Sequence, residues 1–223
     1  MTRQLSADVA TVRANLGRIR HEIAEACARA GRDPQGVRIC VATKYVDADG
    51  LEVLREAGVE IAAENRLQDL SAKQERFGED AFEWHFIGAI QSKKIPEIAR
   101  RVSLIHSLAS ESARARLNAV ETPPRVLVQV NISGEESKQG VRPEDLPQFL
   151  AGCDFPVAGV MTMPPLTDDP EDARVHFAAL REIASQHALA ELSMGTSQDY
   201  AVAVEEGATL IRVGSTLFDP VNT

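Results

Sequence analysis

The sequence predicts an α/β fold in which eight parallel strands close into a (β/α)8 TIM barrel, preceded by an extra N-terminal helix. Eight short apolar runs recur along the chain, and stretches with helical spacing of apolar residues alternate with them. Eight repeats favour closure of the sheet, and 223 residues with 44% hydrophobic content suffice for such a core. A doubly wound open sheet is the alternative, but no GxGxxG follows the first run.

The N-terminal region predicts one long helix. From Leu5 onward, apolar residues recur at alternating steps of four and three, which places them in one stripe, and Gly31 is expected to end the helix. We expect this stripe to pack on its own domain, and a coiled-coil seam is the alternative. The expected organisation is a single domain, 1–223, with the helix in 1–31 and the barrel in 37–219.

The repeating units follow in order along the chain. The predicted strands are Arg38–Thr43, Val59–Ala63, Trp84–Gly88, Val102–His106, Arg125–Asn131, Val157–Met161, Glu191–Met194 and Thr209–Val213. The predicted helices between them are Asp49–Ala57, Leu67–Phe77, Lys93–Arg101, Ser112–Val120, Asp145–Leu150, Asp172–His187 and Asp199–Glu206. Every run but the last is thus followed by a helical stretch, as a barrel of strand–helix units requires.

Charge and composition exclude several classes of partner. The net charge of −9 and the pI of about 5.1 argue against nucleic acid, whose phosphates would be repelled. No apolar run reaches the roughly 18 residues that cross a bilayer, and the start MTRQLSADVA has no apolar signal region. We therefore expect a cytoplasmic protein without a membrane partner.

Cysteine and histidine give no sign of a disulfide or a metal site. The three cysteines form no CxxC pair and are interpreted as buried small hydrophobes, and the five histidines lack the spacing of metal ligands. We therefore expect no metal. These residues are Cys27, Cys40, Cys153, His21, His85, His106, His176 and His187.

A lysine stands at the end of the first predicted strand. In VRICVATKYV, Lys44 follows a run that otherwise avoids charge after Arg38. The carboxyl ends of barrel strands carry the chemistry of such folds, so Lys44 is expected at the mouth. A lysine in a mostly apolar site can act as a nucleophile and form an imine with an aldehyde. The alternative is that its amine simply reaches solvent.

Small polar residues gather after the last two strands. The seventh strand turns through SMGTSQDY, and the eighth ends in IRVGSTLF. Thr196 and Asp199 resemble a capping box, so a helix is expected to begin there, and helix N-termini attract anions. These two loops form the recurrent phosphate site of such barrels, although each alone could be an ordinary turn. The candidate phosphate-binding residues are Ser193, Gly195, Thr196, Gly214 and Ser215.

Arg212 lies inside the otherwise apolar eighth strand. A lone buried guanidinium is costly, so it needs either a carboxylate in the barrel or an acceptor on a ligand, such as a ring nitrogen. Combined with Lys44 and the phosphate site, the second possibility describes pyridoxal 5′-phosphate (PLP). A barrel that binds a phosphorylated sugar, with Lys44 as a Schiff-base lysine, is an alternative.

Several blocks of the sequence resemble a known family. TKYV, AENRLQD, HFIGAIQSKK, VLVQVNISGEESKQG, GVMTMPP and LSMGTSQDYAVAVEEGATLIRVGSTLF are similar to signature blocks of the pyridoxal phosphate homeostasis proteins (YggS/PROSC), over about residues 9–218. The resemblance implies PLP fold type III, related to the alanine racemase barrel. It implies an internal aldimine on Lys44, Asn65 beside the ring, and Arg212 facing the pyridine nitrogen. It assigns the phosphate to Ser193, Gly214 and Ser215.

Arginine opposite the ring nitrogen bears on catalysis. Arginine keeps its proton and does not give it to the pyridine nitrogen, so the ring stays a poor electron sink. Racemisation would also need a second acid/base group on the opposite face of the substrate. Neither Tyr45 nor Tyr200 is an obvious candidate for that role. We therefore expect a monomeric carrier that holds PLP for homeostasis and for delivery to apo PLP-dependent enzymes, without dedicated catalysis. A small amino-acid racemase is the alternative.

Overall fold

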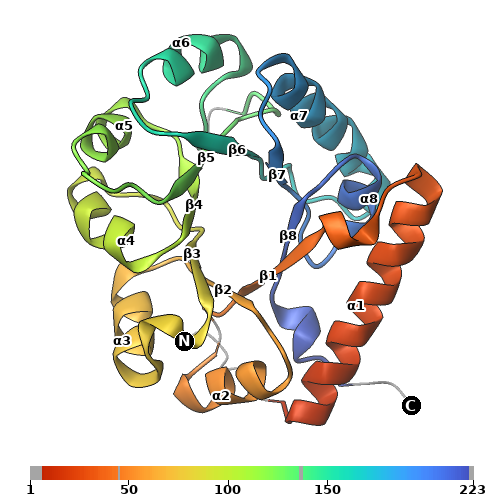
Figure 1. The fold of residues 1–223 in the computed structure, drawn as a ribbon. Helices are drawn as coiled ribbons and strands as arrows, with labels where there is room; N and C mark the ends of the chain where they lie inside the picture. Colours follow the sequence, from red (N-terminus) through yellow and green to blue (C-terminus); the bar gives the residue numbers. More distant parts are fainter. Residues whose placement is uncertain (1–6, 45, 136–137, 221–223) are drawn as a thin grey trace.

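The computed structural model is a closed barrel of eight parallel strands (Figure 1). It describes residues 7–44, 46–135 and 138–220. The strands follow one another in chain order around the barrel, and β8 pairs with β1 to close it. Their bounds are β1 Arg38–Ala42, β2 Ile61–Glu64, β3 Glu83–Phe86, β4 Leu104–Leu108, β5 Arg125–Gln129, β6 Val157–Met161, β7 Glu191–Ser193 and β8 Leu210–Val213. The predicted fold class is confirmed.

The predicted strands differ from the observed ones mainly at their ends. The run that begins at Val59 becomes a strand only at Ile61, because the amide of Val59 donates to the carbonyl of Leu54 and completes the turn that ends the preceding helix. An apolar run therefore locates a strand, but local hydrogen bonds set where it begins.

Helices cover the outside of the barrel. They are α1 Val9–Ala30, α2 Ala48–Glu56, α3 Leu67–Phe77, α4 Ile95–Arg101, α5 Glu111–Asn118, α6 Leu146–Ala151, α7 Arg174–Gln186 and α8 Tyr200–Glu205. Each of the first seven strands is followed by one of them, whereas β8 leads into the short 3-10 turn η6, Ser215–Leu217. Among the described residues, no helix is long and apolar enough to span a membrane.

The N-terminal helix α1 takes the place that an eighth helix would occupy. It lies beside α8 and α2, outside β8 and β1 (Figure 1). The side-chain amide of Asn15 donates to the carbonyl oxygens of Leu217 (3.1 Å) and Asp219 (2.9 Å), which ties α1 to the segment after β8. Gly31 ends α1 with φ +66°, as predicted, and the predicted first stripe residue, Leu5, lies outside the described residues.

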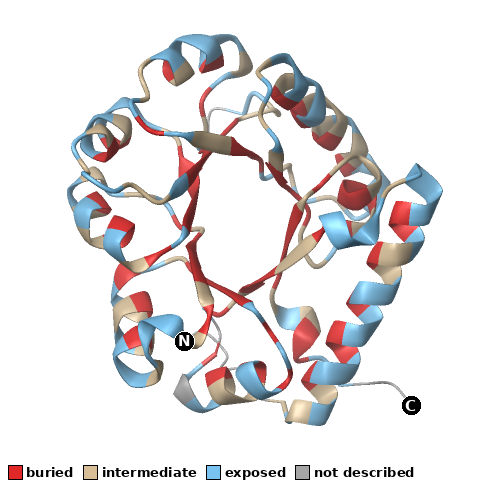
Figure 2. Ribbon diagram, viewed as in Figure 1, coloured by how far each residue is buried: buried red, intermediate tan, exposed pale blue. Residues whose placement is uncertain are grey.

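Two apolar cores flank the sheet, and the strands between them are largely buried (Figure 2). The larger core lies between the strands and the helices. The smaller core fills the barrel interior with side chains that alternate along the strands. Its buried members are Cys40, Ile61, Ala63, Leu104, Leu127, Met161 and Leu210.

Candidate functional site

Lys44 lies two residues beyond the end of β1, at the carboxyl end of the barrel. Cys40 belongs to the interior core, whereas the hydroxyl of Thr43 donates to Glu64 Oε1 (2.5 Å) on the helix side of β2. Lys44 lies in the turn that the amide of Val46 closes on the carbonyl oxygen of Thr43 (2.9 Å), so it stands at the mouth, and the inward direction of its side chain stays a prediction. Its side chain is exposed there, as an amine that meets an entering aldehyde must be.

A second lysine holds the peptide that precedes Lys44. Lys73, on α3, donates to the carbonyl oxygen of Thr43 (2.7 Å) and forms an ion pair with Glu64, whose side chain is fully buried. This brace connects the ends of β1 and β2 to α3. No prediction from the sequence included this brace. The one indication of it in the sequence is the acidic residue that ends the apolar run IAAE.

Asn65 follows β2 at the same end of the barrel and is half-buried. Its backbone touches the turn after β3: a Cβ added to Gly88 would lie 2.0 Å from the carbonyl oxygen of Asn65. Only glycine allows this approach, which fixes the backbone of Asn65 against the turn after β3 at the rim. The contact of Asn65 with a bound ring stays a prediction.

Arg212 is buried inside the barrel with acceptors that carry no charge. Its guanidinium donates to the carbonyl and hydroxyl oxygens of Ser193 (2.7 and 2.5 Å), to the carbonyl oxygen of Thr162 (2.9 Å) and to Met163 Sδ (2.9 Å). Burial lowers the pKa of Arg212 to about 10. None of these contacts is with a carboxylate, which was one of the two partners expected for Arg212. A hydrogen-bond acceptor on a ligand would therefore still stabilise the buried cation.

The loops after β7 and β8 meet through a serine that the sequence analysis missed. Ser197 Oγ accepts hydrogen bonds from the amide of Gly214 (3.2 Å) and from Thr216 Oγ1 (2.8 Å). Gly195 has φ +89°, and a Cβ there would lie 2.6 Å from Ala203 Cβ. Gly214 is half-buried and Ser215 is exposed, so small groups border the predicted phosphate position.

The predicted capping box is half formed. Asp199 Oδ1 accepts hydrogen bonds from both the amide (2.6 Å) and the hydroxyl (3.0 Å) of Thr196, but the Thr196 hydroxyl donates instead of capping an amide. The turn 197–199 therefore separates Thr196 from α8, whose N-cap is Asp199 and which begins at Tyr200. The fixed turn holds Gly195 and Ser197 on either side of Thr196.

Ser193, the last residue of β7, faces the barrel interior. It is fully buried, and its hydroxyl contacts both Arg212 and His106 Nδ1 (2.8 Å). Its predicted role at the phosphate stays a prediction, because in this structure the hydroxyl serves the guanidinium. Among the predicted site residues, the structure thus brings Ser193 and Arg212 into direct contact.

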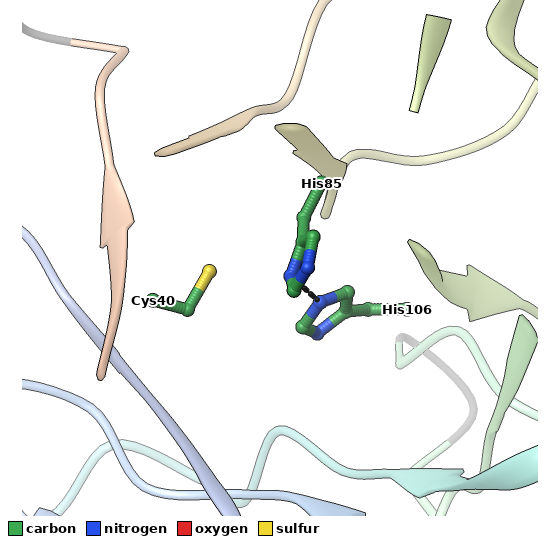
Figure 3. A group of neighbouring side chains, drawn as sticks. All are labelled: Cys40, His85 and His106. Atoms are coloured by element: carbon green, nitrogen blue, oxygen red, sulfur yellow. Dashed lines mark hydrogen bonds between the residues drawn. The ribbon is translucent and has the colours of Figure 1, made fainter. Parts of the chain in front are cut away.

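A chain of polar side chains continues from Ser193 across the interior. His106 Nε2 lies 3.0 Å from His85 Nδ1 (Figure 3). On the other side of the ring, His85 Nε2 lies 3.0 Å from Glu83 Oε1. Burial lowers the pKa of both histidines. The hydrogen bond from His85, assisted by Arg38, holds the pKa of Glu83 well below its usual range. Neutral imidazoles therefore join an ionised carboxylate near one end of the barrel to the guanidinium near the other.

Comparison with known proteins places this site in a family. A scan against protein-family models gave no match. The pyridoxal phosphate homeostasis protein of Aquifex aeolicus is 38% identical over 217 residues, which cover 91% of this chain and 95% of the relative. The chain belongs to the pyridoxal phosphate homeostasis protein family. The member from Pseudomonas aeruginosa is 36% identical over 94% of this chain and 96% of its own, and the member from Escherichia coli is 31% identical over 92% and 94%.

Solved structures agree with this family and with the wider fold. PipY of Synechococcus elongatus, solved with PLP bound, is 31% identical, covers 88% of this chain and all of its own, and superposes with a TM-score of 0.75. The lysine/ornithine decarboxylase of Vibrio vulnificus superposes with a TM-score of 0.68 at 13% identity, over 96% of this chain and 63% of its own. That second likeness concerns the fold alone.

Proposed function

We propose that this protein binds PLP covalently through Lys44 and serves cofactor homeostasis rather than a dedicated reaction. The observation that carries the proposal is the place of Lys44 at the mouth, two residues beyond the strand that pairs with the Arg212 strand. A relative that shares 31% identity over most of the chain was solved with PLP bound. The covalent bond would form between Lys44 Nζ and the aldehyde carbon, with loss of water.

The residues around Lys44 fit the rest of the cofactor. Arg212 offers a buried cation whose present acceptors are neutral, which suits a hydrogen bond to the pyridine nitrogen. Ser215 would offer its backbone amide to the phosphate, and Gly214 would do so in exchange for its present hydrogen bond to Ser197 Oγ, the hydroxyl that lies between the two loops. Asn65 would lie against the ring from the β2 side. When bound, PLP supplies an electrophilic carbonyl and an electron-accepting ring.

The same residues argue against a dedicated racemase. Arg212 stays protonated and cannot deliver a proton to the ring nitrogen, which leaves the ring a weak electron sink. The hydroxyl of Tyr200 donates to Glu22 on α1, in the helix layer. Tyr45 lies outside the described residues. A catalytic acid opposite Lys44 is therefore not supplied by Tyr200.

An absorbance experiment tests the binding proposal. Cofactor-free protein mixed with one equivalent of PLP should develop an absorbance band near the edge of the visible range. Borohydride treatment should then fix the PLP-derived mass on the peptide that contains Lys44. Lys44→Ala should lose both signals, whereas Lys93→Ala, which removes another exposed lysine near the rim, should keep them. A mass fixed elsewhere, or an unchanged band in Lys44→Ala, would refute the assignment.

Delivery of the cofactor and its chemistry are tested separately. The PLP-loaded protein mixed with an apo PLP-dependent enzyme should restore that enzyme's activity as its own band falls, and gel filtration should show a monomer. Incubation with a panel of L-amino acids followed by chiral chromatography should show no D-isomer above the level of free PLP. Racemisation that is lost in Lys44→Ala would support the alternative function.

A further inference from the structure

The barrel interior contains a cluster of potential metal ligands that the proposed function does not use. Cys40 on β1, His85 on β3 and His106 on β4 are fully buried, and one ligand atom from each lies within 4.8 Å of the other two. Figure 3 shows the sulfur of Cys40 directed towards the two imidazole rings. The histidines are 21 residues apart in sequence, and Cys40 is on a different strand, so no spacing motif reveals the cluster.

Each histidine is oriented by a group on its far nitrogen. Glu83 contacts His85 Nε2 at 3.0 Å, and Ser193 contacts His106 Nδ1 at 2.8 Å. A carboxylate or hydroxyl in this position is the usual means of orienting a metal-bound imidazole. The two remaining nitrogens lie 3.0 Å apart, so the rings would move slightly apart to reach the roughly 3.5 Å expected between two nitrogens that each lie about 2.0 Å from a trigonal metal.

We propose that Cys40 Sγ, His85 Nδ1 and His106 Nε2 bind one soft metal ion, with Cu+ the best match. Thiolate and imidazole together select Cu+ and Zn2+ over hard cations. Zn2+ normally takes a fourth ligand, whereas copper accepts a trigonal set of one sulfur and two nitrogens. Among the described residues, the cluster offers three such ligands.

The charge balance also favours the monovalent ion. Cys40 is the register partner of Arg212 on the neighbouring strand, so an added positive charge would lie near a buried guanidinium. A cysteine thiol carries its proton at neutral pH, and a bound metal replaces that proton. Replacement of that proton by Cu+ leaves the charge of the cluster unchanged, whereas Zn2+ adds one unit.

The protons can be followed through the binding step. Ionised Glu83 requires a proton on His85 Nε2, so His85 Nδ1 accepts from His106 Nε2–H, and the Ser193 hydroxyl donates to His106 Nδ1. When the metal binds, the His106 proton moves to Nδ1 and is donated to Ser193 Oγ. One proton, from Cys40, leaves to solvent, and the Ser193 hydrogen becomes available to another acceptor.

The test is a metal-binding measurement on the full chain. Metal-free protein is loaded with Cu+, which ascorbate keeps reduced in the absence of oxygen. The loading is carried out on the native protein and also during refolding, because buried ligands make uptake by the native protein slow. After competition with a chromophoric Cu+ chelator, we expect one Cu+ per chain and release of one proton per ion. X-ray absorption should show one sulfur and two nitrogen ligands.

Matched variants identify the ligands. Cys40→Ser should lose the bound ion, whereas Cys27→Ser, which changes an equally buried cysteine on α1, should retain it. The X-ray absorption result on the unaltered chain decides the matter if Cys40→Ser does not fold. The proposal is overturned if the refolded protein does not retain Cu+ or if the ligands of the bound ion include no sulfur. It is also overturned if folded Cys40→Ser retains Cu+, or if the unaltered protein retains Zn2+ but not Cu+ in a parallel experiment.

Discussion

The two ends of the barrel treat their charged side chains differently. At the amino-terminal end, the first residues of four strands form ion pairs, Arg38 with Glu83 and Arg125 with Glu191. Near the carboxyl end, buried Arg212 meets neutral acceptors, and Lys44 stands exposed at the rim. The first end pairs its charges with one another, whereas the second combines the ion pair of Lys73 and Glu64 with two further cations placed where the proposed anionic ligand would bind.

This difference separates stability from function. Ion pairs that remain partly exposed contribute little to folding, and a buried cation without a carboxylate in contact costs free energy. Removal of a pair at the amino-terminal end should therefore be mild and leave binding intact. Changes near the mouth should act mainly on the ligand.

The largest effect is expected for Arg212→Met, which keeps the length of the side chain and removes its charge. A hydrogen bond to a charged group contributes about 1.5–3 kcal/mol, so the Kd for PLP should rise by about tenfold to a hundredfold. The carbonyl oxygen of Thr162 loses its donor and that of Ser193 keeps only the amide of Thr162 (3.3 Å), so some stability should also be lost. Spectroscopic titration with PLP measures the first effect, and an unchanged Kd would show that Arg212 does not serve the ligand.

A smaller effect should distinguish the two serines near the phosphate position. Ser197→Ala should raise the Kd for PLP about five- to tenfold, from loss of a hydrogen bond of about 1 kcal/mol, and should weaken competition by inorganic phosphate. Ser193→Ala should instead lower the urea midpoint, because it leaves Arg212 and His106 short of a partner. If Ser193→Ala weakens phosphate competition more than Ser197→Ala does, the assignment from sequence is correct.

At the opposite end of the barrel, Arg125→Met should affect stability alone. The pair that Arg125 forms with Glu191 is partly exposed, so the free energy of unfolding should fall by about 1 kcal/mol or less. The Kd for PLP should equal that of the unaltered protein in the same titration. A change in Kd comparable to that of Arg212→Met would contradict the functional separation of the two ends.

The smallest effect concerns the helix layer and depends on pH. The hydrogen bond from Arg174 on α7 lowers the pKa of Glu205 on α8 below its ordinary value of 4.5. A carboxylate with a lowered folded-state pKa stabilises the fold at neutral pH, and this contribution is lost as the pH falls below about 4.5. Arg174→Met should thus lower the urea midpoint slightly at pH 7, and the difference in midpoint between the variant and the unaltered protein should be smaller at pH 3.5. If the difference in midpoint does not change with pH, the ion pair is not the cause of the lost stability.

Much of the fold could be predicted from the sequence because barrel strands are buried on both faces. Continuous apolar runs such as the one at Arg38 or Val157 are hard to place anywhere else. The same property made Lys44 and Arg212 conspicuous, since each interrupts an apolar run. These predictions required only the residues within one strand and the rule that barrel chemistry lies at the carboxyl ends.

The rest depends on register between strands, which one sequence does not encode locally. Whether His85 meets His106 and Cys40 is decided by how β3, β4 and β1 are shifted along the barrel axis. Ser193 and Ser197 illustrate the same limit, because the first is the last residue of a strand and faces inward, whereas the second follows a turn. Lys73 reaches Thr43 from a helix that, in sequence, looks like any amphipathic surface helix.

The hydrogen bonds from Asn15 to the carbonyl oxygens of Leu217 and Asp219 have a consequence for biosynthesis. The two sides of this contact are separated by more than 200 positions. The first helix therefore leaves the ribosome well before α8 and the segment after β8, which cover part of its apolar face. Closure of the barrel and burial of that part of α1 both wait for the same late segment, so the two events are expected to occur together during synthesis.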